Sequence, residues 1–202
     1  TFHLTSPKHA AAGGPAEEVD GLRFYRTPRD EGVLHRIPVL REFALMHATA
    51  RRLEQVVRQV RPDILHAHSP ALNAIPALWV GRRLGIPVVY EVRAFWEDAA
   101  ADHGTSREWG VRYRLTRALE TYALRRVGHV TTICEGLKQD IIGRGIPEKS
   151  VTVIPNAVDL AAFEFGRKPD LALKSTLGLD GMTVIGFIGS FYGYEGLDTL
   201  LD

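Results

Sequence analysis

Cysteine is nearly absent from this 202-residue chain, which contains one cysteine and only two methionines. A single cysteine excludes an internal disulfide framework and any metal site built from several thiolates. The sequence also lacks a signal peptide and any apolar run long enough to cross a membrane. These absences fit a reducing, cytoplasmic setting.

A strong charge of either sign is lacking as well. The chain has 25 Lys and Arg against 24 Asp and Glu, so its formal net charge is +1. Such a balance gives no sign of a nucleic-acid partner. The length allows one large α/β domain, or one domain and part of another.

Short strands rich in β-branched residues alternate with amphipathic helices along most of the chain. Helical spacing of apolar residues predicts helices over residues 39–60, 71–84, 105–126 and 135–143. Strands are predicted over residues 1–5, 22–27, 63–68, 86–92, 129–133 and 151–154. This alternation with short connections predicts an α/β fold, a parallel Rossmann-like sheet with helices on both faces.

Three helix ends carry recognisable signals. Ser69 and Pro70 read as an N-cap followed by the first helical residue, and Gly85 closes the same helix. Thr105 and Glu108 match a capping box, which predicts the start of the long helix there.

The composition divides the chain into three parts. Residues 1–160 form the predicted amino-terminal domain, and residues 161–181 form a linker with a weak helix at 171–177. Residues 182–202 repeat a strand–loop–helix opening, with the strand at 182–188, and so predict the start of a second α/β domain. Because the chain opens in mid-strand and stops inside a helical pattern, we expect that the first strand and most of the second domain are missing from it.

The segment V-V-Y-E-V-R-A-F-W-E-D, residues 88–98, begins as a buried strand and ends as a cluster of charge. Arg93, Trp96, Glu97 and Asp98 lie just beyond the strand. Ligands of open α/β sheets bind outside the carboxyl ends of the strands. The segment therefore predicts a binding site, and the alternative is a surface loop held by a structural Arg–Glu pair.

Polar residues also lie at the carboxyl ends of three other predicted strands. They are His66, His68 and Ser69 at one strand, Cys134 and Glu135 at another, and Asn156 and Asp159 at a third. The convergence favours one site, although one histidine packing under the sheet edge and the other facing solvent is an alternative. Two histidines at i and i+2 with no third ligand in view are weak support for zinc. Cys134 is better explained as a helix-start residue than as a nucleophile.

Four segments resemble the motifs of one family. They are R-P-D-I-L-H-A-H-S (61–69), G-I-P-V-V-Y-E-V-R (85–93), V-T-T-I-C-E-G-L-K-Q-D-I (130–141) and V-T-V-I-P-N-A-V-D (151–159). In this order and spacing they resemble the amino-terminal domain of retaining glycosyltransferases of family 4, which have the GT-B fold. The segment E-V-R-A-F-W-E-D-A is similar to a subgroup tied to bacterial exopolysaccharide and exosortase-associated gene clusters.

The resemblance implies a function for the whole protein. It would transfer a sugar from a nucleotide-sugar donor to an acceptor hydroxyl with retention, in polysaccharide or glycoconjugate synthesis, with no metal and no cofactor. The acceptor would bind the amino-terminal domain and the donor mainly the carboxyl-terminal one. The implied residues are Arg93 and His68 for catalysis, His66, Ser69, Trp96, Glu97, Asp98 and Glu135 for the acceptor, and Asn156, Gly189, Ser190 and Gly196 for the donor.

Two features depart from the family pattern. Arg93 stands where the family usually has a histidine; an arginine stays charged, so it can hold a phosphate or sugar but is a poor proton shuttle. In the glycine-rich loop at 189–196, Ser190 and Glu195 replace the Arg and Lys that clamp the donor pyrophosphate in many relatives. Donor binding would then rely on backbone N–H groups or on residues beyond Asp202.

Two other functions stay open, a sugar-nucleotide epimerase of the same fold class and a non-enzymatic α/β binding module. The acceptor is expected to be a sugar or a lipid-linked sugar, and the chain by itself is expected to be inactive. Arginines in 39–60 and 107–126 could meet anionic headgroups at the inner face of the membrane, and ordinary solvated helix faces explain them equally well. The apolar residues of 182–202 predict self-association through this segment.

Overall fold

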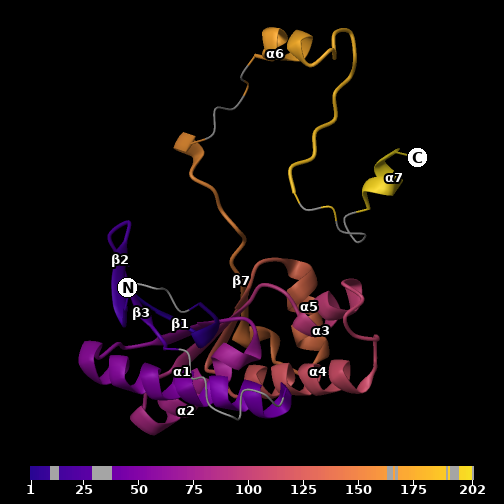
Figure 1. The fold of residues 1–202 in the computed structure, drawn as a ribbon. Coiled ribbons are helices and arrows are strands. Elements are labelled where there is room, and N and C mark those ends of the chain that lie inside the picture. Colours follow the sequence, from indigo (N-terminus) through magenta and orange to yellow (C-terminus); the bar gives the residue numbers. More distant parts are fainter. Residues whose placement is uncertain are drawn as a thin grey trace. The chain divides into compact units, whose positions relative to one another are not determined.

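The computed structural model describes residues 1–9, 14–28, 38–162, 166, 168–189, 191 and 196–201. The chain divides into two compact units, Thr1–Pro155 and Asn156–Asp202. Figure 1 shows the ribbon of both units. Within the described part of the chain, no helix is both long and apolar enough to span a bilayer.

A four-stranded parallel sheet forms the centre of the first unit. Its strands, in spatial order, are β4 (Leu65–His68), β5 (Val88–Val92), β6 (His129–Thr132) and β7 (Val151–Val153). The helices that connect them are α2 (Ala71–Leu84), α3 (Trp96–Asp102), α4 (Val111–Leu124) and α5 (Glu135–Gly143), and a 3-10 turn at Glu148–Ser150 leads into β7. The predicted α/β fold, a parallel sheet flanked by helices, is confirmed.

The two faces of this sheet differ in chemistry. Ala67, Tyr90, Val130 and Val151 lie in register on one face, where all four are buried in the core with side chains of α2, α4 and α5. The next row across the sheet faces the opposite way and is entirely polar: it consists of His68, Glu91, Thr131 and Thr152. This alternation follows from the two-residue period of a strand.

Helix α2 lies directly on the sheet because Gly81 has no side chain. A Cβ atom at Gly81 would be 2.7 Å from the carbonyl oxygen of Ile86 and 2.7 Å from a methyl group of Val88. Both distances are shorter than a real Cβ contact, so an alanine would push the helix away from β5. Helix α1 (Pro38–Val60) packs against α2, and the rings of His47 and Trp79 meet there in a T-shaped arrangement with their centres 5.4 Å apart.

A second, three-stranded sheet holds the amino-terminal strands. Its order is β1 (Phe2–Thr5), β3 (Leu22–Arg26) and β2 (Ala16–Val19), and a 3-10 turn at Pro7–His9 follows β1. Strand β1 runs parallel to β3, whereas β2 runs antiparallel to it. The described strands therefore form two sheets, the four-stranded parallel sheet and this smaller mixed one.

Strand β2 lies in a region that the sequence analysis left without structure. It pairs with β3 through a two-residue turn at Asp20 and Gly21, whose φ angles are 51° and 76°. Two central residues with positive φ make the hairpin turn that suits the twist of the strands, and Asp-Gly is a favoured sequence for it. Arg52 of α1 ties this sheet to the helix by donating hydrogen bonds to the carbonyl oxygens of Arg26 and Pro15.

The helix predicted over 105–126 is shorter than expected. Helix α4 starts at Val111, and a separate helix, α3, precedes it. Thr105 does not cap α4, because its hydroxyl donates to the carbonyl oxygen of Ala100 at 3.0 Å and so closes the end of α3. Trp109, with a φ of 58°, then interrupts the helical path.

The second unit contains three short helical elements among its described residues. They are a 3-10 turn at Leu160–Ala162, α6 (Leu171–Thr176) and α7 (Leu197–Leu201). Asp170 caps α6 by accepting a hydrogen bond from the Leu173 amide at 2.9 Å. The predicted strand at 182–188 is not formed. A strand needs a hydrogen-bonded neighbour, and the described residues of this unit supply none.

Candidate functional site

Four side chains meet near the carboxyl ends of β4 and β5. His66 Nε2 is 3.2 Å and His68 Nδ1 is 3.5 Å from the same carboxylate oxygen of Glu91, its Oε2. Arg93 lies 3.8 Å from the other oxygen, Oε1. We call these four residues the exposed cluster, because the side chains of His66, His68 and Arg93 are about half exposed.

Backbone contacts fix the loops that carry the cluster. The Ser69 amide donates to the carbonyl oxygen of Glu91 at 2.8 Å, and the Arg93 amide donates to the Ser69 hydroxyl at 3.2 Å. Asn73 donates from its side chain to the carbonyl oxygen of His68 at 3.0 Å. Ser69 therefore joins the two strand ends, and the predicted N-cap role of its side chain is wrong.

The exposed cluster brings together two imidazoles, a carboxylate and a guanidinium. Partial burial, together with the neighbouring His68, lowers the pKa of His66 below its usual value, although Glu91 opposes this shift. The two imidazole rings stack at 4.7 Å. Such a set can accept and donate hydrogen bonds to a sugar hydroxyl, and Arg93 can bind a phosphate or carboxylate through its planar fork.

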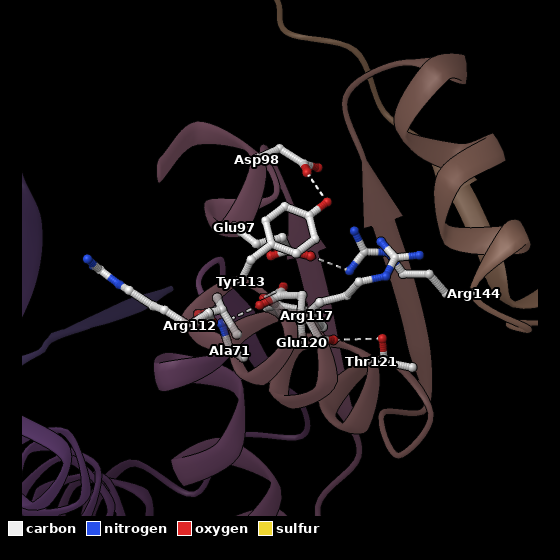
Figure 2. Close-up of polar contacts among 11 residues, drawn as sticks. Ala71, Glu97, Asp98, Arg112, Tyr113, Arg117, Glu120, Thr121 and Arg144 are labelled. Carbon is white, nitrogen blue, oxygen red and sulfur yellow. Dashed lines mark hydrogen bonds and ion pairs between the residues drawn. The ribbon is translucent and has the colours of Figure 1, made fainter. Parts of the chain in front are cut away.

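A second polar cluster is buried under the opposite face of the sheet. Glu120 of α4 accepts hydrogen bonds from the Ala71 amide at 3.0 Å and from the Tyr90 hydroxyl, as Figure 2 shows for Ala71. Burial raises the pKa of Glu120, although both hydrogen bonds oppose the shift. Burial also raises the pKa of Tyr90. Glu120 thus supplies the cap of α2 that Ser69 does not.

Glu97 belongs to the same buried region. Its Oε1 accepts a hydrogen bond from Arg144 at 2.7 Å, and the side chains of both are almost fully buried. The Arg144 guanidinium stacks 3.4 Å from the ring of Phe95. Because a buried carboxylate engaged with an arginine cannot face an acceptor, the predicted acceptor-binding role of Glu97 is corrected to a structural one. Figure 2 shows this pair.

Asp98 and Trp96 lie on the same short helix as Glu97. Asp98 accepts a hydrogen bond from the Tyr113 hydroxyl at 2.6 Å (Figure 2). Burial, together with this bond, raises the pKa of Tyr113 to about 12. Trp96 is 51% exposed and therefore accessible to a ligand. Arg93 forms an ion pair with Glu91 at 3.8 Å.

The remaining predicted site residues are Glu135, Asn156, Gly189, Ser190 and Gly196. Glu135 is exposed in the first turn of α5. Asn156, Gly189 and Gly196 belong to the second unit, and Gly196 has a φ of 66°. Ser190 lies outside the described residues. The acceptor role of Glu135 and the donor roles of the other four stay predictions.

An arginine-rich surface of α4 surrounds an open concavity of about 420 Å³. The residues that line it are Arg114, Arg117, Ala118, Thr121, Tyr122, Arg125 and Arg126. Arg126 lies 3.7 Å from the centre of the Tyr122 ring, and Arg117 lies 5.6 Å from that of Trp109. The guanidinium groups are thus held against aromatic faces at the edge of a hollow.

The sequence analysis missed Glu91, Glu120 and Arg144. For Glu91 a signal existed, because the alternation V-V-Y-E-V places Glu91 on the face opposite Tyr90, and strand pairing then brings it next to His66 and His68. Glu120 and Arg144 read as ordinary helix residues. Their burial depends on contacts 30 to 49 residues away, which no local pattern indicates.

This α/β domain has a Rossmann-like fold, in which ligands bind beyond the carboxyl ends of the strands. The Glycosyltransferase Family 4 model matches residues 10–162, which is most of the chain. The chain therefore belongs to glycosyltransferase family 4.

Two relatives illustrate the likeness. A GDP-mannose-dependent alpha-mannosyltransferase of Mycobacterium tuberculosis (strain CDC 1551 / Oshkosh) is 28% identical over 181 residues, which is 90% of this chain and 44% of that protein. A putative colanic acid biosynthesis glycosyl transferase, WcaI, of Escherichia coli (strain K12) is 25% identical over 150 residues, 72% of this chain and 37% of that protein. The chain spans less than half the length of these curated relatives.

Solved structures also resemble the chain. The crystal structure of Anabaena Alr3699/HepE in complex with UDP and glucose matches with a TM-score of 0.49 and 16% identity, and the match covers 78% of this chain and 37% of that one.

Proposed function

We propose that the whole protein transfers a hexose from a nucleotide-sugar donor to an acceptor hydroxyl with retention, in the synthesis of a polysaccharide or glycoconjugate. Family membership supports transfer, and the names of the mannosyltransferase and of the putative colanic acid enzyme support a hexosyl donor and a polysaccharide product. The observation that carries the proposal is the meeting of His66, His68, Glu91 and Arg93 at the carboxyl ends of two parallel strands.

The exposed cluster is proposed as the acceptor side of the reaction. His68 would accept a hydrogen bond from the acceptor hydroxyl or donate one to it, and Glu91 would orient both imidazoles. Arg93 would bind negative charge that develops on the leaving diphosphate, which is the usual task of a cation in such a transfer. The proposed transfer needs no metal ion.

The test is a donor screen with the full-length protein. GDP- and UDP-hexoses are offered with candidate acceptors, and the products are separated by chromatography and analysed by NMR for the configuration of the new linkage. A retained linkage supports the proposal. A change in the donor sugar without transfer would instead identify a sugar-nucleotide epimerase. If the protein neither transfers the sugar nor hydrolyses the donor, it would be identified as a binding module. Residues 1–202 alone should turn over no donor, because the described residues of the second unit form no sheet.

We also propose that the acceptor is lipid-linked and that the concavity on α4 meets anionic headgroups. Its four arginines, Arg114, Arg117, Arg125 and Arg126, lie on one surface, and each basic residue near an anionic membrane contributes about 1 kcal/mol of attraction. Co-sedimentation with vesicles that contain anionic lipid should fall when all four are changed to Gln. The matched control, Arg82→Gln with Arg83→Gln on α2, should bind as the wild type does. Equal loss in the control would contradict the proposal.

Self-association is proposed through the apolar residues of the second unit. Val184, Ile185, Phe187 and Ile188 are all exposed, and Ile188 completely so. Exposed apolar side chains in sequence favour burial against another surface. Deleting residues 183–202 should lower the oligomeric state measured by light scattering, and an unchanged oligomeric state would contradict this part of the proposal.

A further inference from the structure

Three side chains of the exposed cluster bring potential metal-binding atoms together. His66 Nε2 and His68 Nδ1 lie 3.2 Å and 3.5 Å from Glu91 Oε2, and the three ligand atoms all lie within 4.8 Å of one another. Zinc binds such ligands tetrahedrally at about 2.0–2.1 Å, which places neighbouring ligand atoms about 3.3–3.4 Å apart. Two of the three separations therefore already match the edge of a zinc tetrahedron.

We propose that His66, His68 and Glu91 form a binding site for one divalent zinc-like cation. Two imidazoles and one carboxylate are a donor set that zinc uses in sites with an open fourth position. The side chains are 46%, 56% and 20% exposed, so that the ion can enter from solvent and complete its coordination with water or another ligand.

The sheet holds this arrangement in place. His68 pairs directly with Glu91 in the parallel register of β4 and β5, and His66 lies two residues earlier on the same face. The histidine spacing by itself gave only two ligands. Glu91 is the third, and it is contributed by a neighbouring strand 23 residues after His68 in the sequence.

Arg93 modulates the site. Its guanidinium lies 3.8 Å from Oε1 of Glu91, whereas both histidines address Oε2. The arginine therefore helps to orient the carboxylate, but its positive charge also repels the metal ion that the site would bind. Arg93→Gln should raise the affinity for the ion roughly fivefold, as expected for about 1 kcal/mol of repulsion at a solvated site.

Metal binding is independent of the proposed function, and it can be measured without any activity assay. If the protein also transfers a sugar as proposed, an ion at this site would withdraw His68 from the acceptor, so that zinc would inhibit the transfer. A protein that binds zinc but shows no transfer would separate the two proposals, as would one that transfers a sugar but binds no zinc.

The test uses the protein without a histidine tag, first treated with a chelator. Titration with Zn²⁺ in a calorimeter should give one ion per chain, and Co²⁺ should give the intense visible absorption of a tetrahedral site. His66→Gln, His68→Gln and Glu91→Gln should each weaken binding by roughly a hundredfold or more, since even outer ligands contribute ten- to a hundredfold. The matched control is His129→Gln, because His129 lies on the same face and bonds Thr152 at 2.9 Å instead of the cluster.

Several results would overturn the proposal. Undiminished affinity in a variant that carries all three changes, or loss of binding in His129→Gln, would place the ion elsewhere. Weaker binding in Arg93→Gln would contradict the repulsion between Arg93 and the ion. Circular dichroism and thermal melting establish that each variant is folded. Because His66 and His68 are exposed, the His66→Gln and His68→Gln variants should fold normally. If Glu91→Gln fails to fold, zinc binding by these two variants decides the test.

Discussion

Tyr90 and Glu91 are neighbours in β5, but they belong to two different polar clusters. Tyr90 points into the core, where its hydroxyl bonds Glu120 close to the buried pair of Glu97 and Arg144. Glu91 points to the opposite face, where it contacts His66, His68 and Arg93. One strand thus separates acidic groups whose partners are fixed by burial from acidic groups that a ligand can reach.

The two clusters differ in how far water can reach their side chains. Removing one partner from the buried cluster leaves a charge or a hydrogen-bonding group in an apolar surrounding, which destabilises the fold. Removing one from the exposed cluster leaves a group that water can solvate, so stability changes little. Activity should respond in the opposite way and fall more when a residue of the exposed cluster is changed, because the exposed side chains are those that can touch a substrate.

The largest effect on stability is expected from the buried ion pair. Glu97→Ala should lower the free energy of unfolding by about 3–5 kcal/mol, since it leaves Arg144 buried without its carboxylate. Denaturant unfolding measures this. The double change Glu97→Leu with Arg144→Met should recover much of the loss, because Oε2 of Glu97 and Nε of Arg144 have no hydrogen-bond partner among the described residues. A double variant as unstable as Glu97→Ala would show that the pair itself, and not the orphaned charge, stabilises the fold.

Arg93 should show the opposite pattern. In the full-length enzyme, Arg93→Ala is expected to reduce kcat/KM by roughly tenfold to more than a hundredfold, the equivalent of about 1.5–3 kcal/mol for a lost charge-assisted hydrogen bond. Arg93→Lys should recover only part of this loss, because the planar fork is absent. Kinetics and thermal melting are measured on the same preparation. A lower Tm with unchanged kcat/KM would contradict a role of Arg93 in the reaction.

Glu120 allows a test by pH. Its pKa is raised in the folded protein above the ordinary value of 4.5, so the folded state binds more protons than the unfolded state between those two values. Stability must then rise as the pH falls through this window. Glu120→Gln can keep a carbonyl for the Ala71 amide but cannot titrate, and we expect it to change stability by about 1–3 kcal/mol at neutral pH.

The measurement for Glu120 is a comparison of unfolding curves at several pH values. Relative to Glu120→Gln, the wild type should gain stability as the pH falls from the raised pKa towards 4.5. Parallel pH profiles of the two proteins would mean that Glu120 titrates alike in the folded and unfolded states.

The smallest effect is expected from the histidines. His66→Gln and His68→Gln should each change the free energy of unfolding by less than about 0.5–1 kcal/mol, because both are exposed and exposed pairs contribute little. Thermal melting without added metal measures this. A loss as large as that of Glu97→Ala would remove the distinction between the two clusters.

Local patterns in the sequence predicted most of the fold. Apart from α3, the strands and helices between residues 63 and 154 were found because their apolar residues repeat with clear periods and end at Gly or Pro. The Asp20–Gly21 hairpin was missed although its turn sequence is recognisable, because the short strand before it contains two glutamates, Glu17 and Glu18, and few apolar residues. The capping box at Thr105 was misleading, since the same hydroxyl served the preceding helix.

The candidate site was predicted only in part. His66, His68 and Arg93 were identified because polar residues after parallel strands converge. Glu97 was placed in the same site by its position in the sequence, whereas burial assigns it to the core. Its partner Arg144 lies 47 residues away, and only the packed structure reveals such a pair.

The cap of α2 has a consequence for how the protein is made. Glu120 is 49 residues after the Ala71 amide that it binds, so the ribosome adds it roughly 2–10 s later at ordinary rates of synthesis. Until Glu120 is in place, water can hydrogen-bond the Ala71 amide in the first turn of this helix. When α4 docks, a solvated carboxylate enters the core and its affinity for protons rises. At a pH between the two pKa values, closing this part of the molecule is therefore a proton-uptake step.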